Sequence, residues 1–161
     1  MLFFLRVRMT EIKLQTQKAD LKFLIENNET LKNSLFIKYL DQEALYFFYT
    51  ILTPKTLNQG EMLLPKTEAG NFFMVISGEV FTVFKKGTNQ KLLGTLGKGD
   101  VFAMRKDFEN LFFYANEKTL LAVIDKDNLK ICFEKAPQTK NLLRNYLLDV
   151  SNKIEQLNKN F

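Results

Sequence analysis

Residues 68–80 read EAGNFFMVISGEV, and this stretch decides the fold class. Two strand candidates, 72–77 and 79–85, meet at Gly78, and Gly70 comes just before the first of them. Glycine adopts the positive φ angles of tight turns at little cost, so both glycines mark places where the chain reverses. The stretch therefore predicts short antiparallel strands joined by tight turns.

The same pattern, short runs of alternating apolar and polar residues separated by glycine, extends over residues 56–126. The further strand candidates are 57–64, 91–96, 111–116 and 119–125. The turn signals are at 58–60, 69–71, 77–78, 86–89 and 97–100, and Gly99 lies in the last of these. Many short strands at this spacing predict a sandwich, a barrel or a jelly roll over residues 56–126.

Helical patterns precede the β segment. Residues 11–55 predict N-terminal helices: one or two amphipathic helices, then another that begins near Asp41, a carboxylate in N-cap position, and is stopped by Pro54. Residues 1–10 are expected to be an N-terminal extension, because Met9 would be a natural alternative start.

Residues 127–161 are expected to form the C-terminal helices. Asp127 predicts the cap of a short helix, and Pro137 falls in the first turn of the last one. Apolar residues alternate there at intervals of four and three: Leu143, Leu147, Val150, Ile154, Leu157 and Phe161. That spacing is typical of a coiled-coil seam, so it predicts a dimer helix with the first five of these residues, Leu143 to Leu157, in the interface. The alternative is an ordinary helix that packs on its own domain.

Composition narrows the function classes. The chain of 161 residues is 46% hydrophobic, which suits one compact domain, and it contains no histidine. Without histidine there is no Ser-His-Asp or Cys-His catalysis and no histidine-ligated metal centre. The single cysteine, Cys132, forms no internal disulfide and is predicted to be a small hydrophobic residue on a helix. We expect a cytoplasmic protein that is not an enzyme and has no metal site.

The charge is moderately basic, with a formal net charge of +5 from 23 basic and 18 acidic residues. The basic residues are interleaved with acids, which favours a solvated lysine-rich surface over a nucleic-acid patch. The apolar stretches are far shorter than the roughly 18 residues of a membrane-spanning helix. We therefore expect no membrane association.

The order of these segments resembles the cyclic-nucleotide-binding domain family, as in catabolite-activator-like (Crp/Fnr-like) regulators. The resemblance covers about residues 33–161. The segments that carry it are 35–45, 57–61, 68–80, 97–102, 122–127 and 136–137. It implies a mainly β fold with flanking helices, which is a double-stranded jelly-roll barrel between N-terminal helices and a C-terminal dimer helix.

This family holds its ligand in a phosphate-binding cassette. After a Gly-Asp-x-Phe turn, a Gly-Glu pair opens a short helix, the glutamate binds the ribose hydroxyl, and a later arginine pairs with the phosphate. In this chain Phe102 follows the turn, but Ala103 and Met104 occupy the positions of the pair. The arginine position falls near Glu109 or Asn110, in a shortened segment. The resemblance therefore implies a degenerate cassette with a diverged or empty pocket and no bound cofactor, which makes ordinary cyclic AMP or cyclic GMP binding doubtful.

The candidate ligand pocket is the altered cassette itself: Phe102, Ala103, Met104, Arg105 and Lys106. Arg105 is the only arginine between residues 8 and 144, so it is a candidate for a relocated phosphate clamp beside Lys106. The alternative is a solvated basic pair whose charge is offset by nearby acids.

The leading function is a dimeric regulatory or sensor module. Regulators of this family continue after the dimer helix into a helix-turn-helix domain, whereas this sequence stops at Phe161, as a stand-alone module or as a fragment. We therefore expect no direct DNA binding, and an output through dimerisation or a protein partner. The alternatives are a functional small-molecule or cyclic-nucleotide sensor with the relocated anion site, and a cupin-like enzyme that holds a metal with carboxylates alone.

Overall fold

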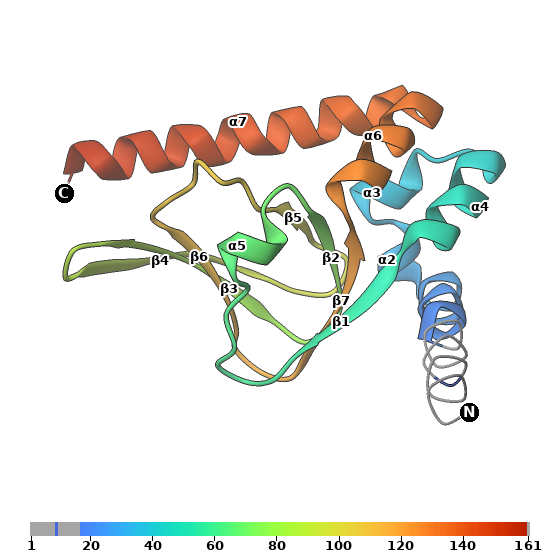
Figure 1. The fold of residues 1–161 in the computed structure, drawn as a ribbon, viewed down its shortest axis with the longest axis horizontal. Helices are drawn as coiled ribbons and strands as arrows, with labels where there is room; N and C mark the ends of the chain where they lie inside the picture. Colours follow the sequence, from blue (N-terminus) through green and yellow to red (C-terminus); the bar gives the residue numbers. More distant parts are fainter. Residues whose placement is uncertain (1–8, 10–16, 161) are drawn as a thin grey trace, which may run out of the picture.

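The computed structural model describes residue 9 and residues 17–160. Its centre is a jelly roll of two antiparallel sheets, with strand orders β1-β7-β2-β5 and β4-β3-β6 (Figure 1). The strands are β1 (Thr53–Leu57), β2 (Phe72–Ser77), β3 (Val80–Lys86), β4 (Asn89–Leu96), β5 (Val101–Ala103), β6 (Leu111–Ala115) and β7 (Thr119–Ile124). The predicted fold class is confirmed.

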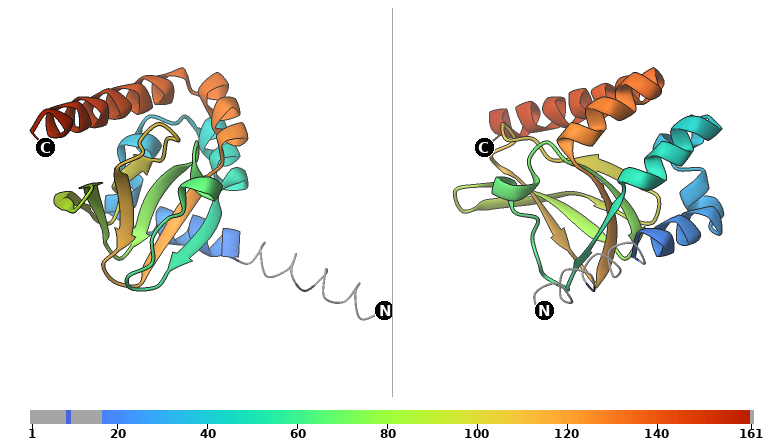
Figure 2. Two further views of the ribbon diagram at one scale, coloured as in Figure 1. Left: turned by 60° about the vertical axis from the view of Figure 1, so that its left-hand side comes forward. Right: turned by 45° about the vertical axis from the view of Figure 1, so that its right-hand side comes forward.

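Helices flank the roll as the sequence predicted. After a helix over residues 17–26, they are α2 (Glu29–Lys32), α3 (Leu35–Lys38), α4 (Gln42–Ile51), α5 (Pro65–Glu68), α6 (Lys126–Lys135) and α7 (Pro137–Asn160). The N-terminal helices and α6 gather at one end of the roll, while α7 runs along its length (Figure 2). No helix in the described part of the chain is both long and apolar enough to cross a membrane.

Of the two predicted N-cap residues, the one before α4 is confirmed and the one before α6 is not. Asp41 is the N-cap of α4, because its Oδ1 accepts a hydrogen bond of 2.8 Å from the amide of Ala44. At α6 the prediction was wrong: Asp125 is the N-cap and accepts from the amide of Asn128, while Asp127 lies inside the first turn. The predicted extension over residues 1–10, Met9 apart, lies outside the described residues.

Two predictions about the strands were wrong. The first strand is Thr53–Leu57 and not 57–64, so Pro54 lies within a strand. The proline is tolerated because β1 is an edge strand that pairs only with β7, so its missing amide need not remove a ladder hydrogen bond. The strand β5 was not predicted at all, since three residues are too few to show an alternating pattern.

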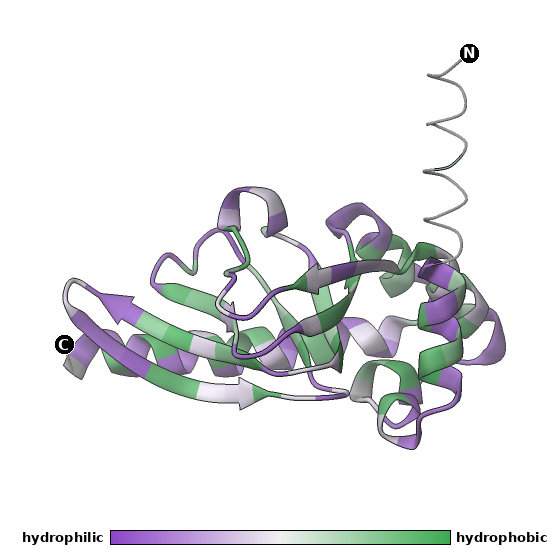
Figure 3. Ribbon diagram, turned by 90° about the horizontal axis from the view of Figure 1, so that it is seen from below, coloured by the Kyte–Doolittle hydropathy of each residue, from purple (hydrophilic) through white to green (hydrophobic). Residues whose placement is uncertain are grey.

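Alternate residues of β2 point into two different cores. Phe72, Met74 and Ile76 face the helices and belong to what we call the helix-side core. Phe73 and Val75 face the second sheet, in what we call the roll interior. In Figure 3 hydrophobic residues run through the middle of most strands, whereas the ends of β3 and β4 at their connecting turn are hydrophilic. The sheet that contains β5 therefore separates two apolar compartments.

Helix α7 lies along the free edge of β5 and contacts both compartments. Leu147 packs against the helix-side core, Val150 and Ile154 pack against the roll interior, and Tyr146 packs against both. Leu143 and Leu157 are already buried within the single chain, with 9% and 7% of their surface exposed. Most of the predicted seam thus packs on its own domain, and its last member, residue 161, lies outside the described residues. Pairing with a second copy through these residues stays a prediction.

Candidate ligand-binding site

The turn that leads into the altered cassette is held rigidly from both sides. The amide of Gly99 donates to the carbonyl of Val75 at 2.8 Å, and Ser34 Oγ donates to the carbonyl of Gly99 at 2.9 Å. Gly99 has a φ of +86°, and a Cβ atom there would lie 3.1 Å from the carbonyl oxygen of Thr30. The turn therefore requires glycine for its conformation, as predicted, and also for its close approach to α2, which the sequence did not indicate.

Phe102, the first residue of the predicted pocket, fills the roll interior. Its side chain is fully buried and lies between two other rings, with centroids 4.9 Å from Phe73 and 4.6 Å from Phe113. Both contacts are stacked, and all three rings are at most 1% exposed. The space beneath the cassette region is thus occupied by the chain's own aromatic side chains.

Ala103 and Met104 are buried as well, on opposite sides of the sheet. Ala103 belongs to the helix-side core and Met104 to the roll interior. The carbonyl of Met104 accepts a hydrogen bond of 2.7 Å from the amide of Gly70, which fixes the end of β5. Residues 104–110 then form turns and contain no helix, so no helix N-terminus is presented to an anion at this point of the chain.

Arg105 and Lys106 point outward to the surface. Arg105 Nε lies 2.9 Å from Asp107 Oδ1, and the guanidinium carbon lies 5.6 Å from the centre of the Phe108 ring. The five predicted pocket residues therefore do not line one cavity: three are buried in the two cores, and the two cations face solvent.

An open surface hollow beside Arg105 is basic. Lys66, Lys106 and Lys126 line it with Arg105, and Asp107 is the one acid among the described residues of its lining. These lysines have no ion pair within the described residues. No local pattern in the sequence points to Lys66 and Lys126, because only the fold brings α5 and the start of α6 to the cassette. The hollow has the charge to hold a small anion, although exposed cations bind weakly and are screened by salt.

The half-buried Tyr146 on α7 and the buried Cys132 on α6 are held in their neutral forms. Burial raises the pKa of Tyr146 to about 12, although a hydrogen bond with the backbone of Ala103 acts in the opposite direction. Burial also raises the pKa of the Cys132 thiol to about 11. Cys132 lies on α6 with 4% of its surface exposed, which confirms it as a small hydrophobic residue on a helix.

No family model matches the sequence, and no curated protein matches it. Solved structures do match the fold. The heme domain of CooA from Carboxydothermus hydrogenoformans aligns with a TM-score of 0.58 and 20% identity, over 82% of this chain and 94% of that chain. The CBD2 domain of PKAR bound to Sp-2Cl-cAMPS aligns with a TM-score of 0.63 and 17% identity, over 85% and 92% of the chains.

A third structure is the guanosine-bound regulatory subunit of a cAMP-independent protein kinase A from Trypanosoma cruzi. It aligns with a TM-score of 0.58 and 14% identity, over 75% of this chain and 46% of that one. The chain has the fold of the cyclic-nucleotide-binding domains. The three matching structures are a heme domain, a domain bound to a cyclic-nucleotide analogue and a subunit bound to a nucleoside. The fold alone therefore does not select a ligand, and the residues of each site must do so.

Proposed function

We propose that this chain is a regulatory module of the cyclic-nucleotide-binding fold whose roll interior holds its own side chains instead of a nucleotide. The observation that carries the proposal is the stack of Phe73, Phe102 and Phe113, completed by Met104 with 4% of its surface exposed. A nucleotide would have to displace these side chains, and interiors packed in this way leave no room for a second occupant.

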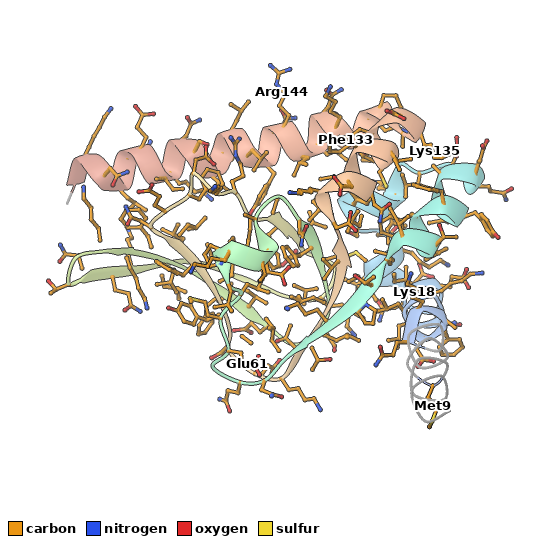
Figure 4. The ribbon with its side chains drawn as sticks, in the orientation of Figure 1. Met9, Lys18, Glu61, Phe133, Lys135 and Arg144 are labelled. Atoms are coloured by element: carbon orange, nitrogen blue, oxygen red, sulfur yellow. The ribbon has the colours of Figure 1, made fainter. Side chains whose placement is uncertain are left out.

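The charge of the roll interior supports the same proposal. Its centre is an apolar cluster of buried residues: Leu57, Leu63, Phe73, Val75, Val80, Phe102, Met104, Leu111, Phe113, Ala115, Leu121 and Val123. Of the two arginines in the described part of the chain, Arg105 faces solvent and Arg144 lies on the side of α7 away from the roll (Figure 4). A cyclic phosphate would lose its hydration there without gaining a partner, which costs several kcal/mol.

Helix α7 is the element through which such a module would act. It rests on both compartments, so a shift at the β5 edge changes the surface that α7 presents. The matching structures include a regulatory subunit and a heme domain, and this supports a regulatory role in preference to an enzymatic one. The expected output is contact with a protein partner or a second copy, in the cytoplasm.

We also propose that two copies associate through the exposed edge of α7. Their own domain covers Leu147, Val150 and Ile154 only in part, and Leu148, beside Leu147, is 54% exposed. In sedimentation velocity, Leu148→Asp on the exposed edge should shift a dimer toward monomer, while Asn152→Asp on an exposed position should not. A wild-type chain that sediments as a monomer at high micromolar concentration would contradict this part of the proposal.

A second candidate function is a sensor that binds an anionic ligand at the surface hollow beside Arg105. The observation that favours it is the convergence of Lys66, Lys106 and Lys126 on Arg105 from three separate segments. Such a sensor would bind its ligand outside the roll, and its affinity would fall steeply as salt is added.

Calorimetric titration of the wild type and of Arg105→Ala with cyclic AMP, cyclic GMP and cyclic dinucleotides tests both candidates. The leading proposal predicts no saturable heat with either protein. Micromolar binding that Arg105→Ala abolishes would establish the second candidate instead. Micromolar binding that Arg105→Ala leaves unchanged would point to a nucleotide inside the roll and contradict both.

A further inference from the structure

The outer face of the β2–β5 sheet is not completely covered by helices. Between α2 and α3 on one side and α7 on the other there remains a cavity of about 710 Å³, which we call the α7 cavity. Phe72 and Val101 line it, and these are the strand neighbours of Phe73 and Phe102. Because side chains alternate along a strand, the α7 cavity lies on the opposite face of the sheet from the roll interior.

The floor of the α7 cavity is apolar and aromatic. Phe36 and Phe72 are 2% and 4% exposed, and their ring centroids lie 4.6 Å apart. Leu142, Leu143 and Tyr146 form the wall on α7. A floor of this kind suits a flat apolar body, which gains both burial and ring contacts.

The rim of the α7 cavity is polar and carries more negative than positive charge. Asn33 and Asn145 supply neutral amides from opposite walls. The charged rim residues are two acids, Asp100 and Asp149, and one cation, Lys98, and all three are exposed. Among the residues that the structure describes, no arginine lines this cavity. This rim repels an anion, whereas neutral polar groups find amide partners on it.

The walls of the α7 cavity are tied to one another. Ser34 Oγ donates to the carbonyl of Gly99, which joins the α3 side to the turn before β5. Gln138 Nε2 donates to the carbonyl of Tyr39 at 2.7 Å, which joins the start of α7 to the segment after α3. The cavity is therefore supported by its own hydrogen bonds, and its size lies within the range of pockets that hold small molecules.

We propose that the α7 cavity is a binding site for a small, uncharged molecule with an aromatic body and neutral polar groups. A ligand there touches the N-terminal helices, the turn before β5 and α7 at once, so it fixes α7 against the sheet. The proposal is independent of the proposed function, because the α7 cavity and the roll interior lie on opposite faces of the sheet.

Two fluorescent probes that share a skeleton test the proposal on the full chain. N-phenyl-1-naphthylamine is neutral, and 8-anilinonaphthalene-1-sulfonate adds one negative charge to the same ring system. We expect saturable fluorescence enhancement by the neutral probe at one site per chain, and about fivefold weaker binding of the sulfonate because of the acidic rim. Absence of saturable binding by the neutral probe, or tighter binding of the sulfonate, would overturn the proposal.

Tryptophan substitutions on α7 test whether the probe binds in the α7 cavity, because a bulky side chain there takes up the space that the probe needs. The chain has no tryptophan of its own. Leu142→Trp fills the α7 cavity from its wall, and Asn145→Trp narrows its mouth from an exposed position. Asn152→Trp is the matched control, because it is exposed on the same helix outside the lining. We expect a loss of about tenfold or more in affinity for the first two and no change for the control. Should Leu142→Trp fail to fold, Asn145→Trp decides alone, and equal affinity in all folded variants would refute the site.

Discussion

Val101 and Phe102 are neighbours in β5, yet they serve compartments that differ in what fills them. Phe102 closes the roll interior as the middle ring of a three-ring stack, whereas Val101 borders the α7 cavity, which the side chains that the structure describes leave open. Both compartments are apolar and contain aromatic rings. The difference teaches that ligand capacity in this fold depends on how far side chains fill each face of one sheet, more than on the sheet itself.

The largest expected effect comes from emptying the filled compartment. Phe102→Ala should lower the free energy of unfolding by about 3–5 kcal/mol, because it removes a fully buried ring and leaves a cavity. Val101→Ala, one residue away beside an existing cavity, should cost about 1 kcal/mol. Urea unfolding of both variants measures the contrast, and equal losses would mean that the two compartments are packed alike.

The next effect comes from restoring the acidic residue that the family resemblance implies at position 104. Met104→Glu should destabilise the chain by roughly 3 kcal/mol at pH 7, because it buries a carboxylate in an apolar interior. Burial raises the pKa of such a group above its unfolded value, so the loss should shrink as the pH falls toward 4. The neutral variant Met104→Gln should show no such dependence on pH, and a Met104→Glu protein as stable as wild type would indicate that water reaches the roll.

A smaller effect tests how α7 is attached along the border between the compartments. Tyr146→Phe removes the hydroxyl that is hydrogen-bonded to the backbone of Ala103 and should cost about 1 kcal/mol near neutral pH. The pKa of Tyr146 is raised to about 12 in the folded chain, so the folded state holds this proton more tightly than the unfolded state.

Tyr146 therefore contributes stability that is fully present below pH 10 and is lost as the pH rises toward 12. The pKa of Cys132 is raised to about 11, so its ionisation also lowers the stability at high pH, equally in wild type and in Tyr146→Phe. The gap in stability between wild type and Tyr146→Phe should accordingly narrow above pH 10 in denaturant titrations. A gap that stays constant up to pH 12 would contradict the buried state of this hydroxyl.

The smallest expected effect concerns the rim of the open compartment. Asp149→Asn removes one of its two acids, so the preference for the neutral probe over the sulfonate should fall by about twofold. Glu134→Gln, an exposed acid outside the lining, should leave the ratio unchanged. An equal change in both variants would mean that the preference reflects net charge and not the rim.

The sequence predicted local features well where a single residue type determines the backbone conformation, as in a glycine turn or an aspartate N-cap. Gly70, Gly78 and Gly99 all have positive φ angles, and Asp41 caps α4 as expected. The first strand remained hidden because it depends on a distant partner. Pro54 read as a helix stop, and only its pairing beside β7 reveals an edge strand.

The candidate site was less predictable than the fold. The altered cassette was recognisable from Ala103 and Met104, but their directions follow from the register of β5 against β2, which no local pattern fixes. The periodicity of α7 correctly indicates a buried ridge without telling whose core buries it. The α7 cavity was invisible in the sequence, because its walls come from three segments far apart in the chain.

The most direct test of this account is a crystal structure of the full chain grown with both cyclic AMP and N-phenyl-1-naphthylamine. We predict density for the dye between α3 and α7, an undisturbed stack of Phe73, Phe102 and Phe113, and no nucleotide in the roll. Density for cyclic AMP inside the roll, with Phe102 displaced to admit it and the α7 cavity empty, would contradict the central claim.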